Sequence, residues 1–136
     1  VEATSKMSQE LTWQLIRKHN SFIRKQGGET FSAEPNNLLN KHSFKYSGLA
    51  NNSAVGVSIN KDAKSGNILK GAVLSIKSRN RAERNKPNKT WTKTVLRRDF
   101  RRVARTIRAN TEGSFYRRDL TNAALVRWTK INQIRI

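Results

Sequence analysis

The stretch VGVSINKDAKSGNILKGAVLSIK, residues 55–77, contains the two clearest strand patterns of the chain. Residues 55–59 and 72–77 place apolar side chains at every second position, which is the period of a β-strand with one buried face. The polar segment between them, residues 61–67, contains Gly66 and predicts a turn. We therefore expect an antiparallel pair, as part of a meander of three or four strands.

A short helix is predicted upstream, over residues 7–18, with Ser8 placed to cap its first turn. Residues 1–6 are polar and are expected to form a flexible leader. The apolar residues of the helix fall on two sides, so we expect it to be packed on both. They are Leu11 and Leu15 on one side, and Trp13 and Ile16 on the other.

Between this helix and the strand pair lie a predicted hairpin and a long irregular stretch. Gly27 and Gly28 accept positive φ at low cost, which favours a tight turn between residues 21–25 and 29–32. Residues 33–52 are polar and show no period. Because twenty residues without an element are unusual in a compact domain, this segment is expected to be functional or to lie against a partner.

An aromatic and basic cluster lies within residues 33–52. Phe44 and Tyr46 neighbour Lys41 and Lys45. Aromatic rings beside cations stack on unpaired bases, but alternating aromatic residues also enter protein cores. Core packing is the interpretation we favour for the rings, and the two lysines are candidate RNA contacts.

Downstream of the strand pair the composition becomes polar and strongly basic. Residues 78–89 contain no large apolar side chain, and such a composition disfavours autonomous folding. We predict a basic loop over residues 78–90 that becomes ordered on RNA, and a nuclear-localisation patch in the same loop stays compatible with this. Its candidate contacts are Arg79, Arg81, Arg84, Lys86 and Lys89.

Helical spacing returns from about Thr92 to Asn110. Arginines three and four residues apart repel, by about 0.2–0.5 kcal/mol per pair in an isolated helix, and Asp99 is the one acidic residue among them. An ordinary solvated face mixes both signs of charge, so this face predicts a polyanion contact. Its arginines are Arg97, Arg98, Arg101, Arg102, Arg105 and Arg108, opposite the apolar residues Leu96, Phe100, Val103, Ala104 and Ile107.

A last helix is predicted to begin at Asp119 as its cap, preceded by Arg117 and Arg118 as further candidate contacts. Its apolar face consists of Leu120, Ala123, Ala124, Trp128 and Ile131, with Arg127 inside it. The chain is therefore predicted to be an α+β fold. A helix and a small antiparallel β-sheet over residues 7–77 come first, then the basic loop, then two basic amphipathic helices over residues 91–136.

Charge is distributed unevenly along the 136 residues, whose formal net charge is +19. Residues 1–68 carry 9 basic and 5 acidic side chains, whereas residues 69–136 carry 19 and 4. Thirteen of those 19 are arginines, whose planar guanidinium binds phosphate oxygens in pairs. Self-repulsion of this size favours a polyanionic partner. The charge predicts nucleic acid, with RNA favoured.

The sequence gives no support for an enzyme or a metal site. It contains no Cys, and His19 and His42 have no suitably spaced carboxylates. No phosphate loop, nucleophile elbow or carboxylate pair is present, so no catalytic residue, cofactor or small-molecule substrate is predicted. No apolar run approaches the length of a membrane span. Adsorption of the arginine helix to an anionic bilayer stays open as an alternative.

Several blocks of the chain resemble one family, the eukaryote-type large-subunit ribosomal protein family L28e. The resemblance covers roughly residues 7–131 and is densest over 31–57. Its blocks are MSQELTW (7–13), NSF (20–22), FSAEPNNL (31–38), HSFKYSGLAN (42–51), VGV (55–57) and YRRDL (116–120) followed by Ala123 and Ala124.

This resemblance implies a structural protein of the cytosolic large (60S) ribosomal subunit that binds ribosomal RNA beside neighbouring ribosomal proteins. It implies no catalysis and no cofactor, and a cytoplasmic location after nuclear and nucleolar transit during assembly. Two alternatives stay open. One is a nuclear ribosome-assembly factor that shares the N-terminal domain, and the other is a free RNA-binding regulator.

Overall fold

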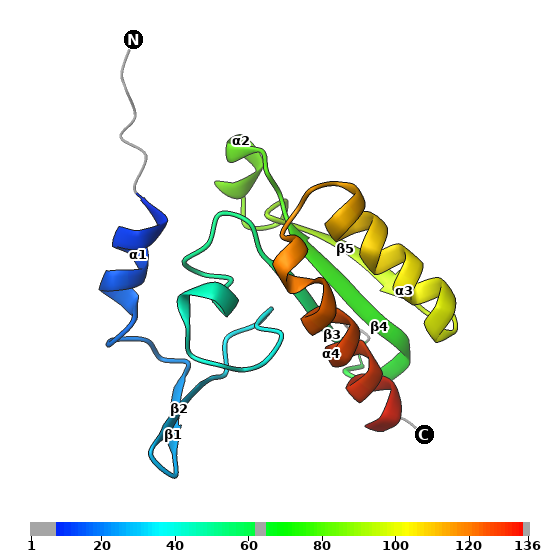
Figure 1. The fold of residues 1–136 in the computed structure, drawn as a ribbon, viewed down its shortest axis with the longest axis horizontal. Coiled ribbons are helices and arrows are strands. Elements are labelled where there is room, and N and C mark those ends of the chain that lie inside the picture. Colours follow the sequence, from blue (N-terminus) through cyan, green and yellow to red (C-terminus); the bar gives the residue numbers. More distant parts are fainter. Residues whose placement is uncertain (1–7, 62–64, 135–136) are drawn as a thin grey trace.

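The computed structural model describes residues 8–61 and 65–134. A three-stranded antiparallel sheet is covered on one face by the helices α3 and α4, and a smaller N-terminal part lies beside it (Figure 1). The α+β class predicted from the sequence is confirmed, with the helix first, then strands, then the C-terminal helices. The leader expected over residues 1–6 lies outside the described residues.

The sheet consists of β3 (Val55–Lys61), β4 (Ile68–Lys77) and β5 (Trp91–Leu96), in the order β3-β4-β5. The two strands read from the alternating pattern are confirmed, and they pair with Val55 opposite Ile76. The antiparallel meander is also confirmed. Its third strand, however, is β5, which follows the basic segment, and the upstream hairpin forms a sheet of its own.

Strand β5 corrects the sequence-based prediction, which placed its residues at the start of a helix over 92–110. Three of the six residues in β5 are β-branched, which suits an extended backbone. Pairing with β4 then provides the hydrogen bonds that a helical turn would have supplied. Gly71, with a φ of 97°, lets β4 approach closely, since a Cβ there would lie 2.5 Å from the Leu96 carbonyl oxygen. The helix begins only at Phe100.

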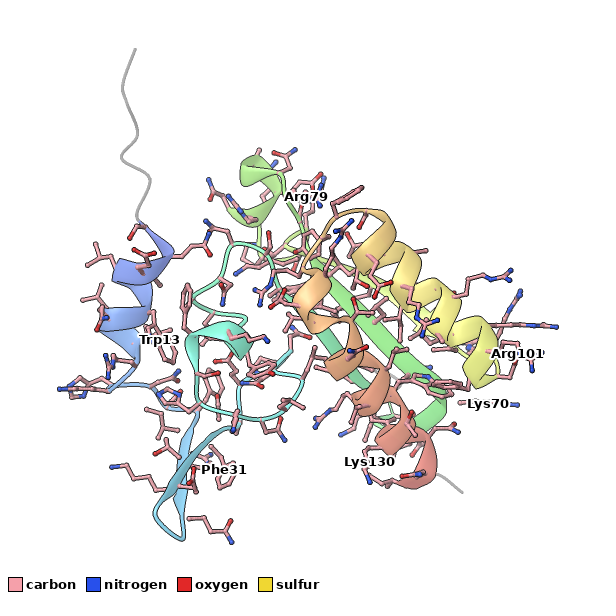
Figure 2. The ribbon with its side chains drawn as sticks, viewed as in Figure 1. Trp13, Phe31, Lys70, Arg79, Arg101 and Lys130 are labelled. Carbon is pink, nitrogen blue, oxygen red and sulfur yellow. The ribbon has the colours of Figure 1, made fainter. Side chains whose placement is uncertain are left out.

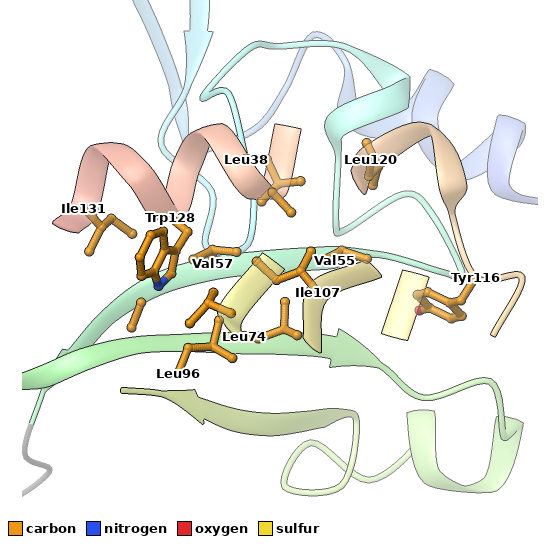
Figure 3. Packing of buried hydrophobic residues seen from close by; sticks show 13 residues of the cluster. Leu38, Val55, Val57, Leu74, Leu96, Ile107, Tyr116, Leu120, Trp128 and Ile131 are labelled. Atoms are coloured by element: carbon orange, nitrogen blue, oxygen red, sulfur yellow. The ribbon is translucent and has the colours of Figure 1, made fainter. Parts of the chain in front are cut away.

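The core lies between the sheet and two helices, α3 (Phe100–Arg108) and α4 (Thr121–Ile134), as Figure 3 shows. The apolar faces predicted for both helices are largely confirmed. Phe100 is the exception, because it is 52% exposed, with its ring tilted at 40° to that of Trp128 and the centroids 5.8 Å apart. The buried cluster consists of Leu38, Val55, Val57, Ala72, Leu74, Leu96, Val103, Ile107, Tyr116, Leu120, Ala124, Trp128 and Ile131.

Two short helical turns join α3 to α4. Helix α3 runs on into a single π-helical turn, η2 (Ala109–Gly113), and a 3-10 turn, η3 (Arg118–Leu120), precedes α4. Asp119 was expected to cap the last helix, but it lies inside η3 with its carboxylate bound by Arg117.

The N-terminal part contains α1 (Gln9–Ile16), β1 (Ile23–Gln26) and β2 (Glu29–Ser32). The Ser8 cap is confirmed, since its hydroxyl accepts a 3.0 Å hydrogen bond from the Leu11 amide. The hairpin is also confirmed, with positive φ at both glycines of its turn. The expected packing of α1 on two sides is wrong. Leu11 and Leu15 are 52% and 60% exposed, because only the opposite side of the helix meets the rest of the chain.

Residues 33–52 remain irregular apart from a 3-10 turn, η1 (Phe44–Tyr46). The segment is nevertheless packed onto its own domain, because Leu38 belongs to the core and Glu34, Asn37 and Asn51 are buried. Polar side chains take the place of regular secondary structure here by bonding backbone groups. The Asn37 amide nitrogen, for example, donates to the Lys41 carbonyl at 2.9 Å.

The basic segment over 78–90 connects β4 to β5 and contains a helical turn, α2 (Arg81–Arg84). Its two ends are joined by a 2.8 Å bond from the Ser78 amide to the Thr90 carbonyl. The Ser78 hydroxyl also bonds the Glu83 carboxylate. The segment is therefore a compact connection with one helical turn, and its ordering on RNA stays a prediction.

Candidate nucleic-acid interface

The arginine surface is the set of six arginines on α3 and on the connection that leads into it. All six are exposed, because the opposite side of α3 buries Val103, Ala104 and Ile107 against the sheet. Figure 2 shows Arg101 on α3 at the outer side of the molecule. The six are Arg97 and Arg98 before the helix, and Arg101, Arg102, Arg105 and Arg108 within it.

Among residues 8–61 and 65–134, acidic side chains neutralise very little of this charge. Asp99 pairs with Arg102 at 3.5 Å, and the two side chains are 61% and 67% exposed. An ion pair so open to water contributes little, so the surface keeps a strong positive potential. Since the apolar side of α3 is buried in the core, it is unavailable to a bilayer, which argues against membrane adsorption.

An open hollow of about 750 Å³ lies at the C-terminal end of the arginine surface. Arg101, Arg105 and Arg108 line it from α3, and Arg118 lines it from η3. Phe115 is also part of its lining and is 74% exposed. Phe115 was not among the predicted contacts, because nothing in the periodicity distinguishes an exposed ring from a buried one.

A second, smaller hollow of about 190 Å³ lies at the other end of the surface. Arg97 and Arg98 line it together with Lys70 at the start of β4, and Trp128 and Ile131 contribute apolar atoms. Figure 2 labels Lys70. Lys70 was not among the predicted contacts either, since only the pairing of β4 with β5 brings it to this end of α3.

Arg117 was a predicted contact, but the structure directs it inward. Its guanidinium donates to the Ser53 carbonyl at 2.9 Å and to the Lys45 carbonyl at 2.7 Å. It also forms a two-pronged pair with Asp119, at 3.0 and 2.9 Å. Hydrogen bonding to Arg117 lowers the pKa of Asp119, although partial burial opposes the shift. Arg117 therefore joins the C-terminal helices to the irregular segment.

The predicted contacts in the 78–90 segment fall into two groups, those bonded to the rest of the domain and those exposed to solvent. Arg79 donates to the Ser114 carbonyl at 2.8 Å and lies over the Tyr116 ring, and half-buried Arg84 donates to the Asn52 carbonyl. Both thus hold the segment onto the domain. The other three predicted contacts are Lys86 and Lys89, which are exposed, and Arg81, whose side chain lies outside the described part of the structure.

Lys41 and Lys45 are exposed on the irregular segment, which lies on the far side of α4 from α3 (Figure 1). The structure therefore does not bring them to the arginine surface. The neighbouring rings of Phe44 and Tyr46 face the protein interior, which agrees with the core packing favoured from the sequence. Tyr46 packs against the core, and Phe44 packs against Trp13 of α1.

Buried polar contacts fix the irregular segment to the sheet. The Glu34 carboxylate accepts from the Gly48 amide and the Ser47 hydroxyl. The Lys77 ammonium of β4 donates to the Gly48 and Asn51 carbonyls, both at 2.8 Å. Burial lowers the pKa of Lys77, nearby Arg84 lowers it further, and Glu34 opposes the shift. The densest part of the family resemblance is therefore built from residues that hold the fold.

Neither a metal site nor a membrane span is found in the described parts of the chain. Over residues 8–61 and 65–134, no three His, Asp or Glu side chains come together as a metal site would require. His42 instead bonds the Arg17 carbonyl at 2.7 Å and packs its ring against Trp13. The helices within these residues are all too short or too polar to cross a bilayer.

Comparison with known proteins agrees with the pattern of residues. Residues 11–134 match the Ribosomal L28e protein family. Three relatives carry the name large ribosomal subunit protein eL28. The one from Schizosaccharomyces pombe is 33% identical over 92% of this chain and 90% of its own length. Those from Dictyostelium discoideum and Caenorhabditis elegans are 44% and 40% identical, over 54% and 66% of this chain and 57% and 64% of their own lengths. The chain belongs to the Ribosomal L28e protein family.

Proposed function

We propose that this protein is a structural constituent of the cytosolic large (60S) ribosomal subunit, and that it binds and stabilises ribosomal RNA through the arginine surface. Membership of the family supports the assignment to the subunit, since the relatives are named as large-subunit proteins. The observation that carries the RNA contact is the arginine surface itself, with six exposed arginines and one acid on one side of α3.

Physical chemistry supports RNA as the ligand of this surface. Backbone phosphates provide most of the affinity of nucleic-acid complexes, and each contact releases condensed counterions. Guanidinium groups bind phosphate oxygens in pairs. Val103 and Ile107 fix helix α3 to the sheet, so the backbone that carries these donors is already ordered and binding costs side-chain entropy alone. The protein then acts by occupying space between RNA segments and linking them, and the proposed role is structural rather than catalytic.

The exposed lysines elsewhere extend this proposal. Lys86 and Lys89 in the β4–β5 connection, and Lys41 and Lys45 on the irregular segment, lie away from α3 and would meet other RNA segments. A structural protein with cations on several sides joins RNA strands that are far apart in sequence. Assembly of such a particle implies nuclear and nucleolar transit before the protein reaches the cytoplasm with neighbouring ribosomal proteins.

Sedimentation of a tagged chain from cell extract tests this proposal. We expect the protein to co-sediment with 60S subunits and 80S ribosomes after a high-salt wash. The double variant Arg101→Glu/Arg105→Glu should move to the light fractions. The matched control Lys18→Glu/Lys25→Glu makes the same change in net charge on exposed residues of the N-terminal part, and it should stay with the ribosome. Wild-type protein found solely in nucleolar precursor particles would contradict the proposal and favour an assembly factor.

A further inference from the structure

Phe115 is an exposed aromatic ring in an unfavourable backbone conformation, surrounded by arginines. Its φ is 52°, in the left-handed region that side chains with a Cβ avoid. Single exposed apolar residues are ordinary on protein surfaces. At Phe115 the positive φ is that of the left-handed residue that ends a helix, a position usually taken by glycine. The aromatic ring at this position is 74% exposed, so burial in the core does not account for it.

The backbone around Phe115 is tightly held. The Phe115 amide donates to the Glu112 carbonyl at 3.1 Å, and the next amide, of Tyr116, donates to the Thr111 carbonyl at 2.8 Å. Together the two bonds form a Schellman cap, in which Phe115 is the left-handed residue that ends the helical segment. On the other side, the Ser114 carbonyl accepts from Arg79. The ring is therefore presented from a fixed loop.

The surroundings of the ring are cationic. The Arg118 guanidinium lies over it, with Cζ 4.2 Å from the ring centroid. Arg101, Arg105 and Arg108 line the same hollow from α3, and Glu112 is the one acid among the described residues of its lining. A ring surrounded by guanidinium groups is a poor binding site for an apolar side chain of another protein. Such a ring is better suited to stack on a nucleotide base, whose flanking phosphates would meet the guanidinium groups.

We propose that Phe115 is a stacking platform for one unpaired RNA base, with Arg101, Arg105, Arg108 and Arg118 holding the flanking phosphates. This inference rests on the proposed function and adds the kind of RNA recognised. The hollow then selects a strand whose base is turned out of the helix. A fully paired stem meets only the arginines. The Arg118 guanidinium continues the stack on one face of the ring, and the base occupies the other.

Two RNA hairpins with the same stem test this inference. In one probe a single 2-aminopurine is bulged, and in the other it is paired. Wild-type protein should bind the bulged probe more tightly and quench its fluorescence. Phe115→Ala should weaken binding of the bulged probe about tenfold, within the range for loss of one stacked base, and abolish the quench. Binding of the paired probe should change less than twofold, and Phe115→Trp should restore both readouts.

Two further variants separate this inference from the proposed function. Arg101→Ala/Arg105→Ala should weaken both probes alike, and the control Leu15→Ala, which removes an exposed apolar residue of α1, should leave both unchanged. If the arginine variant weakens binding but Phe115→Ala keeps the preference for the bulge and the quench, the stacking inference is wrong and the RNA-binding surface stands. If the arginine variant weakens neither probe, the proposed RNA contact itself fails.

Discussion

The Tyr116 hydroxyl donates a 2.6 Å hydrogen bond to the Lys77 carbonyl, 39 residues away at the end of β4. The same hydroxyl accepts a 3.0 Å bond from the Ala54 amide, just before β3. One side chain from the loop between α3 and α4 thus satisfies a backbone group at the end of β4 and another just before the adjacent strand β3. Burial raises the pKa of Tyr116, although its backbone bond and nearby arginines oppose the shift. The hydroxyl therefore stays protonated wherever the protein is folded near neutral pH.

Tyr116→Phe should destabilise the protein by about 1–3 kcal/mol, because two buried backbone groups lose their partner. Tyr46→Phe is the control, since the structure records no hydrogen bond for that hydroxyl within the described residues. Urea denaturation measures both. Because the folded pKa of Tyr116 is raised, its contribution is complete below about pH 10 and is lost as the pH rises through the folded pKa. A difference between wild type and Tyr116→Phe that grew above pH 10 would contradict this account.

Asp119→Asn should destabilise the protein by less than about 1 kcal/mol, since the carboxylate that pairs with Arg117 is partly exposed. The pKa of Asp119 is lowered in the folded state, so its contribution is complete above about pH 4 and is lost as the pH falls through the folded pKa. Denaturation of both proteins between pH 2 and pH 7 should show the two curves converging at the acid end. A constant difference across this range would exclude the ion pair as its source.

Gly56→Ala should cost about 1–3 kcal/mol of stability, as overpacking does. A Cβ at this position would lie 2.5 Å from the Asn36 Cβ and 2.7 Å from its Cα, so the irregular segment would have to shift. Gly113→Ala is the matched control, because its nearest neighbour is the Arg108 carbonyl oxygen at 3.9 Å. Thermal unfolding compares the two variants, and equal melting temperatures would show that the close approach of Asn36 is unimportant.

Phe115→Gly should be more stable than Phe115→Ala by roughly 1 kcal/mol. Both variants lose the ring and its contact with Arg118, but only glycine adopts the positive φ at this position without strain. The ordinary entropic cost of glycine opposes part of this gain. Urea denaturation measures the difference. An alanine variant as stable as the glycine variant would show that the backbone at position 115 is unstrained.

Local patterns predicted the elements whose residues interact with near neighbours. The alternation over 55–59 and 72–77, the Gly27-Gly28 turn and the Ser8 cap all fall in this class. Strand β5 was missed because its conformation depends on pairing with β4, whereas Leu96 and Phe100 have helical spacing by coincidence. Arg117 and Arg118 are neighbours with the same side chain, but Arg117 points inward to the Ser53 carbonyl and Arg118 lies over the exposed Phe115 ring. Local sequence does not predict this difference, because it depends on where each residue lies in the fold.

The arginine surface was predicted more completely than any other part of the candidate site. Four of its six residues alternate with apolar positions along α3, so burial of Ile107 and Val103 fixes which way those four face. Phe115 and Lys70 were missed because their exposure depends on a left-handed residue and on the pairing of β4 with β5. Sequence periodicity carries neither kind of information.

The salt dependence of RNA binding tests the arginine surface most directly. Affinity for an RNA stem is measured across a range of KCl concentrations, for wild type, Arg101→Glu/Arg105→Glu and the control Lys18→Glu/Lys25→Glu. Each phosphate contact contributes about 0.7–0.9 to the slope of log affinity against log salt. We predict that the slope for the arginine variant is less steep than that for wild type by at least about 1.4, and that the control leaves the slope unchanged. An equal slope for the arginine variant and wild type would mean that this face of α3 points into solvent and binds no RNA.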